Sequence, residues 1–286
     1  MPFETHRLGV LAPKRLPTGL LLAVPLLGVD CAKQDTPKAQ LSASQPAPAV
    51  NSTPKPTAAA SGEHPAFQER TAERERLVKH ALEGEGIKAP NVLQAMRKVP
   101  RHRFVPEPSR AEAYANRPLP IGYGQTISQP YIVAAMTEAV LPTPGDRCLE
   151  IGTGSGYQAA VLAELCDRVF SIEYLPGVAA FGAENLRALG YDAPRVMLRV
   201  GDGFQGWPEA APFEVIVVTA APEEVPQPLL DQLAVGGRLV IPVGPREGVQ
   251  QLERWVRLRA GSDEPAFRRE ILMGVRFVPF LGDAQN

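Results

Sequence analysis

A short apolar run that ends in an acid and a glycine-spaced turn restricts the fold of this 286-residue chain more than any other feature. The run at residues 148–151 leads into Gly152, Gly154 and Gly156, and a helix-like stretch, 158–165, follows. Glycines at such a turn permit positive φ angles and let the backbone approach a ligand closely. A strand, a glycine turn and a helix N-terminus in this order predict the entry unit of a doubly wound α/β domain.

The spacing of the glycines separates two kinds of nucleotide loop. A dinucleotide fingerprint, Gly-x-Gly-x-x-Gly, requires glycine at position 157, where this chain has Tyr157. Gly-x-Gly-x-Gly after the acid Glu150 resembles instead the S-adenosylmethionine loop of Rossmann-like methyltransferases. The resemblance implies cofactor contacts by Glu150, Gly152, Gly154 and Gly156; the alternative is a structural turn without a ligand.

Two further acids lie at the ends of predicted strands. Glu173 ends the apolar stretch 168–173, about 20 residues after the glycines, where a carboxylate accepts hydrogen bonds from ribose hydroxyls. Asp202 and Gly203 follow the stretch 195–200, and Asp202 can accept from an adenine amino group at that edge. The alternatives are an ordinary charged strand end for Glu173 and a plain Asp-Gly turn for Asp202.

The alternation of apolar and helix-like stretches predicts one large domain at about residues 67–281, within a segment 67–286. The stretch 214–219 is apolar almost throughout, as expected for a strand buried on both faces. We therefore expect a Rossmann-like, mainly parallel seven-stranded sheet with its ligand site at one edge. The last two strands, 252–258 and 272–277, have no helix between them and should form an antiparallel edge. An N-terminal helical cap is predicted at 70–82 and 90–98.

The amino-acid composition argues against several kinds of partner and catalytic site. The formal net charge is −1 at pH 7, so no charge excess favours a nucleic-acid partner. No histidine lies beyond His102, which argues against a Ser-His hydrolase and a His-ligated metal in the catalytic half. Cys148 and Cys166 lack metal-like spacing and are expected to be small buried hydrophobes. The basic cluster at 101–103 is expected to be a solvated turn rather than an anion site.

The N-terminal 66 residues have a different composition. Basic residues precede an apolar run at 19–29 that suits a secretory signal and is too short to span a bilayer. Cys31 follows a poor lipobox, and residues 32–66 have the composition of a disordered Pro/Ala/Ser linker. The segment 1–31 is thus a signal-like sequence or an untranslocated extension. Contact with a membrane is expected only if the segment 1–31 is retained in the mature protein.

The segment 119–131 carries the most specific resemblance. No periodic pattern explains it as helix or strand, and its glycines and prolines indicate a shaped loop. Its Thr-Ile-Ser-Gln-Pro run at 126–130, together with the glycine loop and Gly-Asp-Gly at 201–203, closely resembles protein-L-isoaspartate O-methyltransferase. The resemblance implies that Ser128 is the catalytic residue and that Ile127 helps to cover the cofactor. From the residues alone, a cap of the helix expected at 131–140 is the favoured role for Ser128.

The family resemblance also implies the reaction. S-adenosylmethionine would methylate the free α-carboxylate of L-isoaspartyl residues in damaged proteins, which starts repair through a succinimide. Because S-adenosylmethionine is kept inside cells, we expect a cytoplasmic enzyme; export to the periplasm or anchoring through 1–31 is the alternative. Two other functions remain open: a methyltransferase for a small-molecule carboxylate or hydroxyl, and a cofactor-binding protein without turnover.

Overall fold

The computed structural model describes residues 64–259 and 266–283 of the chain. The predicted signal-like segment 1–31 and the linker, up to residue 63, lie outside the described residues. Among the described residues, no helix is both long and apolar enough to cross a membrane.

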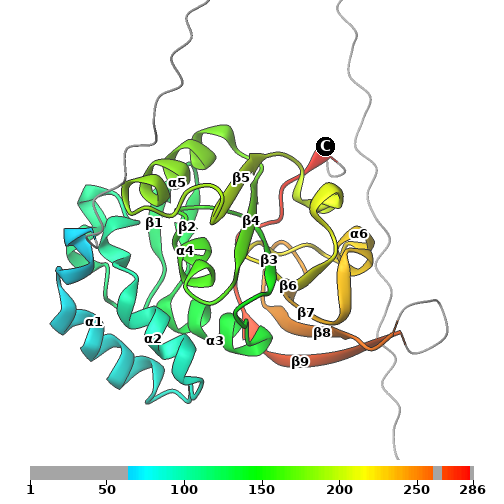
Figure 1. Cartoon of the computed structure of the whole chain (residues 1–286), viewed down its shortest axis with the longest axis horizontal. Coiled ribbons are helices and arrows are strands. Elements are labelled where there is room, and N and C mark those ends of the chain that lie inside the picture. The colour runs from blue at the N-terminus through cyan, green and yellow to red at the C-terminus, as the bar shows by residue number, and fades with distance from the viewer. Residues whose placement is uncertain (1–63, 260–265, 284–286) are drawn as a thin grey trace, which may run out of the picture. The chain divides into compact units, whose positions relative to one another are not determined.

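A seven-stranded sheet forms the centre of the domain (Figure 1). The first five strands of the sheet are parallel, and the last two pair antiparallel at one edge. Both the mainly parallel sheet and its antiparallel edge are confirmed. In spatial order the strands are β5 (Val196–Val200), β4 (Arg168–Glu173), β3 (Arg147–Ile151), β6 (Phe213–Val218), β7 (Leu233–Val243), β8 (Gln250–Arg257) and β9 (Phe267–Val275).

Helices and loops cover the two faces of the sheet, and each face has its own hydrophobic core. One core contains Cys148 and Val215 with residues of α3 (Pro130–Val140), α4 (Tyr157–Ala163) and α5 (Pro176–Ala188). The other contains Leu149 and Ile216 with residues of α6 (Gln227–Asp231). Successive residues of β3 and of β6 thus point to opposite cores, which explains why apolar residues lie on both faces of each strand.

The N-terminal cap packs beside α3 and α4 (Figure 1, cyan). The helix predicted at 70–82 begins as α1 (Thr71–Leu77) and continues as a π-turn, η2 (Val78–Leu82). The second predicted helix is α2 (Pro90–Lys98), where proline occupies the first turn. Short 3-10 turns complete the cap: η1 (Pro65–Gln68), η3 (Arg101–Arg103) and η4 (Glu107–Glu112). Two further 3-10 turns, η5 (Gly203–Gln205) and η6 (Pro208–Ala210), follow β5.

The segment predicted as a shaped loop contains a small hairpin. Its strands, β1 (Leu119–Gly122) and β2 (Gln125–Ile127), pair antiparallel around a turn at 122–124. All three turn residues have positive φ, including Tyr123 at 55°. The strands are too short for an alternating pattern to be read in the sequence, which is why the hairpin was not predicted. The Tyr123 ring lies over α5, where a Cβ on Gly177 would approach it to 2.7 Å.

Two expectations about individual side chains were wrong. Cys148 in β3 and Cys166 after α4 are buried, but they form a disulfide, with 6.4 Å between their Cα atoms. In the basic cluster, Arg101 and His102 are buried rather than solvated, at 0% and 3% exposure. His102 lies between Glu69 and the Tyr114 hydroxyl, 2.8 Å from each. Hydrogen bonds from Arg103 and His102 lower the pKa of Glu69 to about 2.

Candidate active site

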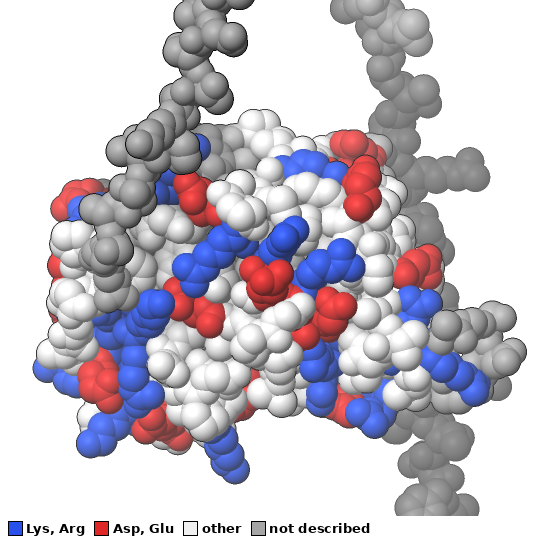
Figure 2. Space-filling model, viewed as in Figure 1, with Lys and Arg blue, Asp and Glu red and all other residues white. Residues whose placement is uncertain are grey.

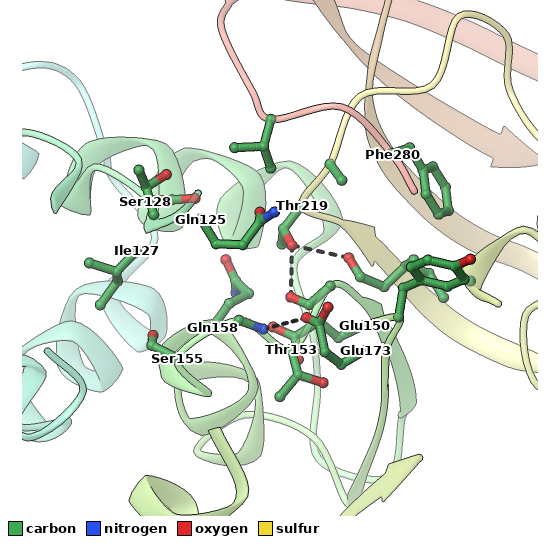
Figure 3. Close-up of a pocket in the computed structure, with 18 of the residues that line it drawn as sticks. Gln125, Ile127, Ser128, Glu150, Thr153, Ser155, Gln158, Glu173, Thr219 and Phe280 are labelled. Carbon is green, nitrogen blue, oxygen red and sulfur yellow. Dashed lines mark hydrogen bonds between the residues drawn. The ribbon is translucent and has the colours of Figure 1, made fainter. Parts of the chain in front are cut away.

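A cavity lies at the carboxyl ends of β3, β4 and β6 and extends to the β1–β2 hairpin (Figure 3). The C-terminal segment 278–281 forms a further wall. Ser128 and Ile127 lie across the cavity from Phe280. Most of the predicted site residues line the cavity: Ile127, Ser128, Glu150, Gly152, Gly154, Glu173 and Gly203. Gly156 and Asp202 are not among its lining residues.

Thr219, which follows β6, holds the start of the glycine loop by hydrogen bonds. The Thr219 hydroxyl donates to the carbonyl of Gly152 at 2.8 Å and to that of Ile151 at 3.0 Å (Figure 3). Gly152 has φ +95°, and a Cβ at this position would overlap the Thr219 side chain. Gly156 serves packing instead: it is the N-cap of α4, and a Cβ there would lie 2.8 Å from Leu186 Cγ of α5. The loop therefore presents its main chain to the cavity through Gly152 and Gly154.

Glu173 binds the glycine loop as well as bordering the cavity. Its Oε2 accepts from the Gly154 N–H and its Oε1 from the Leu175 N–H, each at 3.0 Å. Each carboxylate oxygen has a second lone pair, so these bonds leave capacity for a ligand hydroxyl. Glu173 thus fixes the position of the loop relative to β4, a role that its place at a strand end did not reveal.

Glu150 is the most perturbed acid of the site. Its side chain is fully buried, and the Ser171 hydroxyl donates to its Oε2. Ser171 in turn lies 2.6 Å from the Thr153 hydroxyl. Glu150 Oε1 has no hydrogen-bond partner within the described part of the chain. Burial raises the pKa of Glu150 from 4.5 to about 8, so its carboxyl is mostly protonated at neutral pH without a ligand.

Asp202 precedes Gly203 in the chain but does not line the cavity. Its Oδ1 accepts from the Phe204 N–H at 2.9 Å, which makes it the cap of the 3-10 turn that follows. This is the local turn that had been the alternative to adenine binding. Gly203 borders the cavity, and a Cβ at this position would lie 2.4 Å from Ile151 Cγ2 and 2.9 Å from the Phe280 ring.

Ser128 does not cap the helix that follows it. The N-cap of α3 is Gln129, whose side chain makes no capping hydrogen bond; Asn116 Oδ1 instead accepts from the Tyr131 N–H in the first turn at 3.0 Å. Ser128 lies instead between the main cavity and a second, adjoining pocket, and lines both. The second pocket extends past Gln129 and Ile132 to residues 274–278, at the end of β9 and just after it. Thr126, Thr219 and Val278 also border both spaces.

Several lining residues were not predicted. Thr219 was expected only as the last residue of the apolar stretch 214–219, and an uncharged strand end carries little signal. Gln158 was expected only as the start of a helix. In the structure its Nε2 donates to Thr137 at 3.0 Å, while its Oε1 has no partner in the part of the chain described.

The chemistry of the lining distinguishes between ligands. Two carboxyl groups, Glu150 and Glu173, border the cavity, and none of the residues that line it is Lys, Arg or His. A dinucleotide phosphate would find no cationic side chain in this lining, and the Glu173 carboxylate would repel it. A cation that also carries ribose hydroxyls fits the acceptors, because the orphaned Glu150 oxygen and the Glu173 carboxylate can both receive hydrogen bonds. The described residues contain no cluster of acids, histidines and cysteines suited to a metal ion. The fold and this lining define a Rossmann-like methyltransferase with an S-adenosylmethionine site.

Comparisons with known proteins identify the family. The model of the protein-L-isoaspartate(D-aspartate) O-methyltransferase family matches residues 72–285. The protein-L-isoaspartate O-methyltransferase of Opitutus terrae is 56% identical over 218 residues, which make up 76% of this chain and 91% of that protein. The chain therefore belongs to the protein-L-isoaspartate O-methyltransferase family, as its 126–130 segment predicted, and is an S-adenosylmethionine-dependent enzyme.

Solved structures agree with this assignment. A protein-L-isoaspartate O-methyltransferase has a TM-score of 0.65 and 29% identity, covering 73% of this chain and 66% of its own. A putative protein-L-isoaspartate O-methyltransferase from Plasmodium falciparum, solved with S-adenosyl-L-homocysteine, has a TM-score of 0.64 and 24% identity. The match covers 73% of this chain and 99% of the Plasmodium chain, and supports the fold.

Proposed function

We propose that this enzyme methylates the free α-carboxylate of L-isoaspartyl residues in damaged proteins and peptides, with Ser128 as the catalytic residue. The observation that carries the proposal is the position of Ser128 on the boundary of two spaces, the glycine-loop cavity and the adjoining pocket. The first space suits the cofactor and the second the substrate. The Ser128 hydroxyl is engaged in no hydrogen bond to a described residue, so it is available to a substrate carboxylate.

The remaining predicted residues are assigned to the cofactor. S-adenosylmethionine, when bound, supplies a methyl group on a positively charged sulfur. Glu150 and Glu173 provide hydrogen-bond acceptors for the polar groups of the cofactor. Gly152 and Gly154 bring the main chain of the glycine loop close to it, and the Ile127 side chain covers it. Gly203 and Asp202 are proposed to border the adenine, and Gly156 to support the loop through its packing on α5. The Plasmodium structure with S-adenosyl-L-homocysteine is consistent with a cofactor of this type.

The site needs no general base for this reaction. A carboxylate nucleophile has an ordinary pKa of about 4 and is already ionised at neutral pH. The residues of the site have to align it with the methyl group, and alignment can supply several kcal/mol of the rate enhancement. Hydroxyl and N–H donors are sufficient to orient a carboxylate. A cavity lining without histidine is compatible with this chemistry.

One assay tests the proposal against its alternatives. Tritiated methyl transfer is measured to an isoaspartyl peptide, to its normal aspartyl twin and to small carboxylic acids. We expect label on the isoaspartyl peptide only. Transfer to small acids instead would support a small-molecule methyltransferase, and cofactor binding without transfer would support a protein without turnover.

Ser128→Ala tests the catalytic assignment. Loss of the hydroxyl should lower kcat/KM on the isoaspartyl peptide, while affinity for S-adenosylhomocysteine, measured by calorimetry, changes much less. A helix cap would instead contribute about 1 kcal/mol of stability with near-normal turnover. Unchanged kcat/KM would remove Ser128 from the reaction.

We further propose that the enzyme acts in the cytoplasm on protein substrates and binds no nucleic acid. The supply of S-adenosylmethionine inside cells supports the location, and the signal-like residues 1–31 support export or anchoring as the alternative. The formal net charge of −1 supports the absence of a nucleic-acid partner. On the face shown in Figure 2, acidic and basic side chains are intermixed, without a continuous basic region.

A further inference from the structure

We propose that Arg101, in the cap, is a positioning residue of the active site that holds the Ser128–Gln129 peptide group in the orientation needed for methyl transfer. This inference rests on the proposed role of Ser128. Arg101 borders neither the main cavity nor the adjoining pocket, so its action is through the main chain rather than through contact with a ligand.

The contacts of Arg101 join three separate parts of the fold. Its Nη2 donates to the Ser128 carbonyl at 2.8 Å, and its Nε donates to the Ala113 carbonyl at 2.9 Å. Its guanidinium carbon lies 4.9 Å from the ring centroid of Tyr157, the first residue of α4. One side chain thus links the cap, the segment that carries Ser128 and the helix that follows the glycine loop.

The environment of Arg101 is costly for a cation. The residue is 0% exposed, and within the described residues no carboxylate pairs with it. Burying a charge without a counter-ion costs several kcal/mol. Burial lowers the pKa of Arg101 to about 10, so the guanidinium remains charged at neutral pH. Because the guanidinium is charged, it makes a stronger hydrogen bond to the Ser128 carbonyl than a neutral donor would.

The geometry of the peptide group shows what this bond does. The carbonyl of Ser128 and the N–H of Gln129 belong to one planar trans peptide, in which the two groups point in opposite directions. Anchoring the carbonyl on Arg101 therefore turns the Gln129 N–H away from Arg101. That N–H donates to no acceptor within the described residues, and Ser128 and Gln129 both border the adjoining pocket. A substrate carboxylate there requires donors, and the polarised Gln129 N–H is one beside the Ser128 hydroxyl.

The cap contains a matched control, Arg74. It is 2% exposed and donates to two main-chain carbonyls, those of Phe67 at 2.5 Å and Lys98 at 2.9 Å. Both of its acceptors lie in the cap and not in the active-site segment. Arg74→Lys and Arg101→Lys therefore make the same chemical change in similar surroundings. Lysine keeps the charge but cannot reproduce the two-pronged geometry of the guanidinium.

The experiment compares both variants with the wild-type full-length enzyme at a temperature where all are folded. For Arg101→Lys we expect kcat on the isoaspartyl peptide to fall by about 10- to 100-fold, as for a small misplacement of a reacting group. Affinity for S-adenosylhomocysteine should change less than about threefold on the same reasoning. Arg74→Lys should lower the midpoint of thermal unfolding and leave kcat near the wild-type value. Arg101→Gln, which removes the buried charge, replaces Arg101→Lys if the lysine variant does not fold.

Hydrogen exchange of the 126–131 segment is the second measurement and does not depend on the substrate. Exchange there should be faster in Arg101→Lys than in the wild type, and unchanged in Arg74→Lys. Wild-type kcat in a folded Arg101 variant, or unchanged exchange at 126–131, would overturn the inference. If the wild type itself fails to methylate the isoaspartyl peptide, the proposed function fails, and the exchange measurement still decides whether Arg101 anchors the segment.

Discussion

The buried carboxyl of Glu150 leads to a prediction about stability as a function of pH. In the folded protein its pKa is about 8, against 4.5 for an ordinary glutamate, mainly because burial penalises the charged form. The folded state therefore binds this proton more tightly than the unfolded state does. Between pH 4.5 and about 8 the unfolded chain loses the proton first, so the stability of the ligand-free protein should fall as pH rises through this window.

The size of the effect follows from the two pKa values. Integrating the linkage relation from about pH 5 to about pH 7.5 gives a loss of about 3 kcal/mol from this one carboxyl group. A domain of this kind has a free energy of unfolding of roughly 5–15 kcal/mol, so the loss is readily measurable. The Glu150→Gln variant should not show this loss of stability with rising pH. The Gln side chain has nearly the same shape, cannot ionise, and still offers an oxygen to the Ser171 hydroxyl.

The assay is denaturant unfolding of both proteins without cofactor at several pH values across this range. Taking the difference between wild type and variant removes the contributions of all other titrating groups. We expect the difference to shift by about 3 kcal/mol in favour of Glu150→Gln between the two ends of the range. Parallel stability curves for the two proteins would refute the reasoning, because Glu150 would then titrate alike in the folded and unfolded states.

Three further predictions concern the cofactor, the disulfide and the N-terminus. Glu173→Ala should weaken S-adenosylmethionine binding by about 1.5–3 kcal/mol in calorimetry. It should also loosen the glycine loop, because the Glu173 carboxylate accepts from the Gly154 N–H. Asp202→Ala should weaken binding similarly, and wild-type affinity in both folded variants would contradict the assignment. Cys166→Ser should lower the free energy of unfolding by about 3 kcal/mol, the loop-closure value for a bridge across 18 residues, and equal stability of the wild type with and without reductant would disagree. Cell fractionation with N-terminal sequencing should find the enzyme in the cytoplasm, whereas a mature periplasmic chain that starts near Ala32 would show export.

The sheet and most of the cavity could be predicted because their signals are local. The strands β3, β4 and β6 are mostly apolar, and parallel strands bring their carboxyl ends to one edge. Glu173 follows from this rule, whereas Glu150 was assigned through the resemblance of the glycine loop to that of Rossmann-like methyltransferases. Ser128, in contrast, was assigned only through a family resemblance, since serine before a helix is more often a cap.

The features that were missed depend on contacts between distant residues. Arg101 is buried because its acceptors are carbonyls 12 and 27 residues away, and no pattern near 101–103 encodes them. The pairing of Cys148 with Cys166 depends on how the chain after α4 returns to the start of β3, which spacing alone does not determine. The hairpin at 119–127 is shorter than the window in which alternation can be recognised.

The bond between Cys148 and Cys166 closes a covalent ring that contains every residue of the glycine loop. Glu150 is connected to α4 by two routes, one along the main chain and one through the sulfur atoms. A single protease cut within the ring adds one water molecule and opens one route, and the disulfide keeps the two pieces covalently joined until a reductant is added. Separating β3 from α4 thus takes two chemical events of different kinds, one hydrolytic and one reductive.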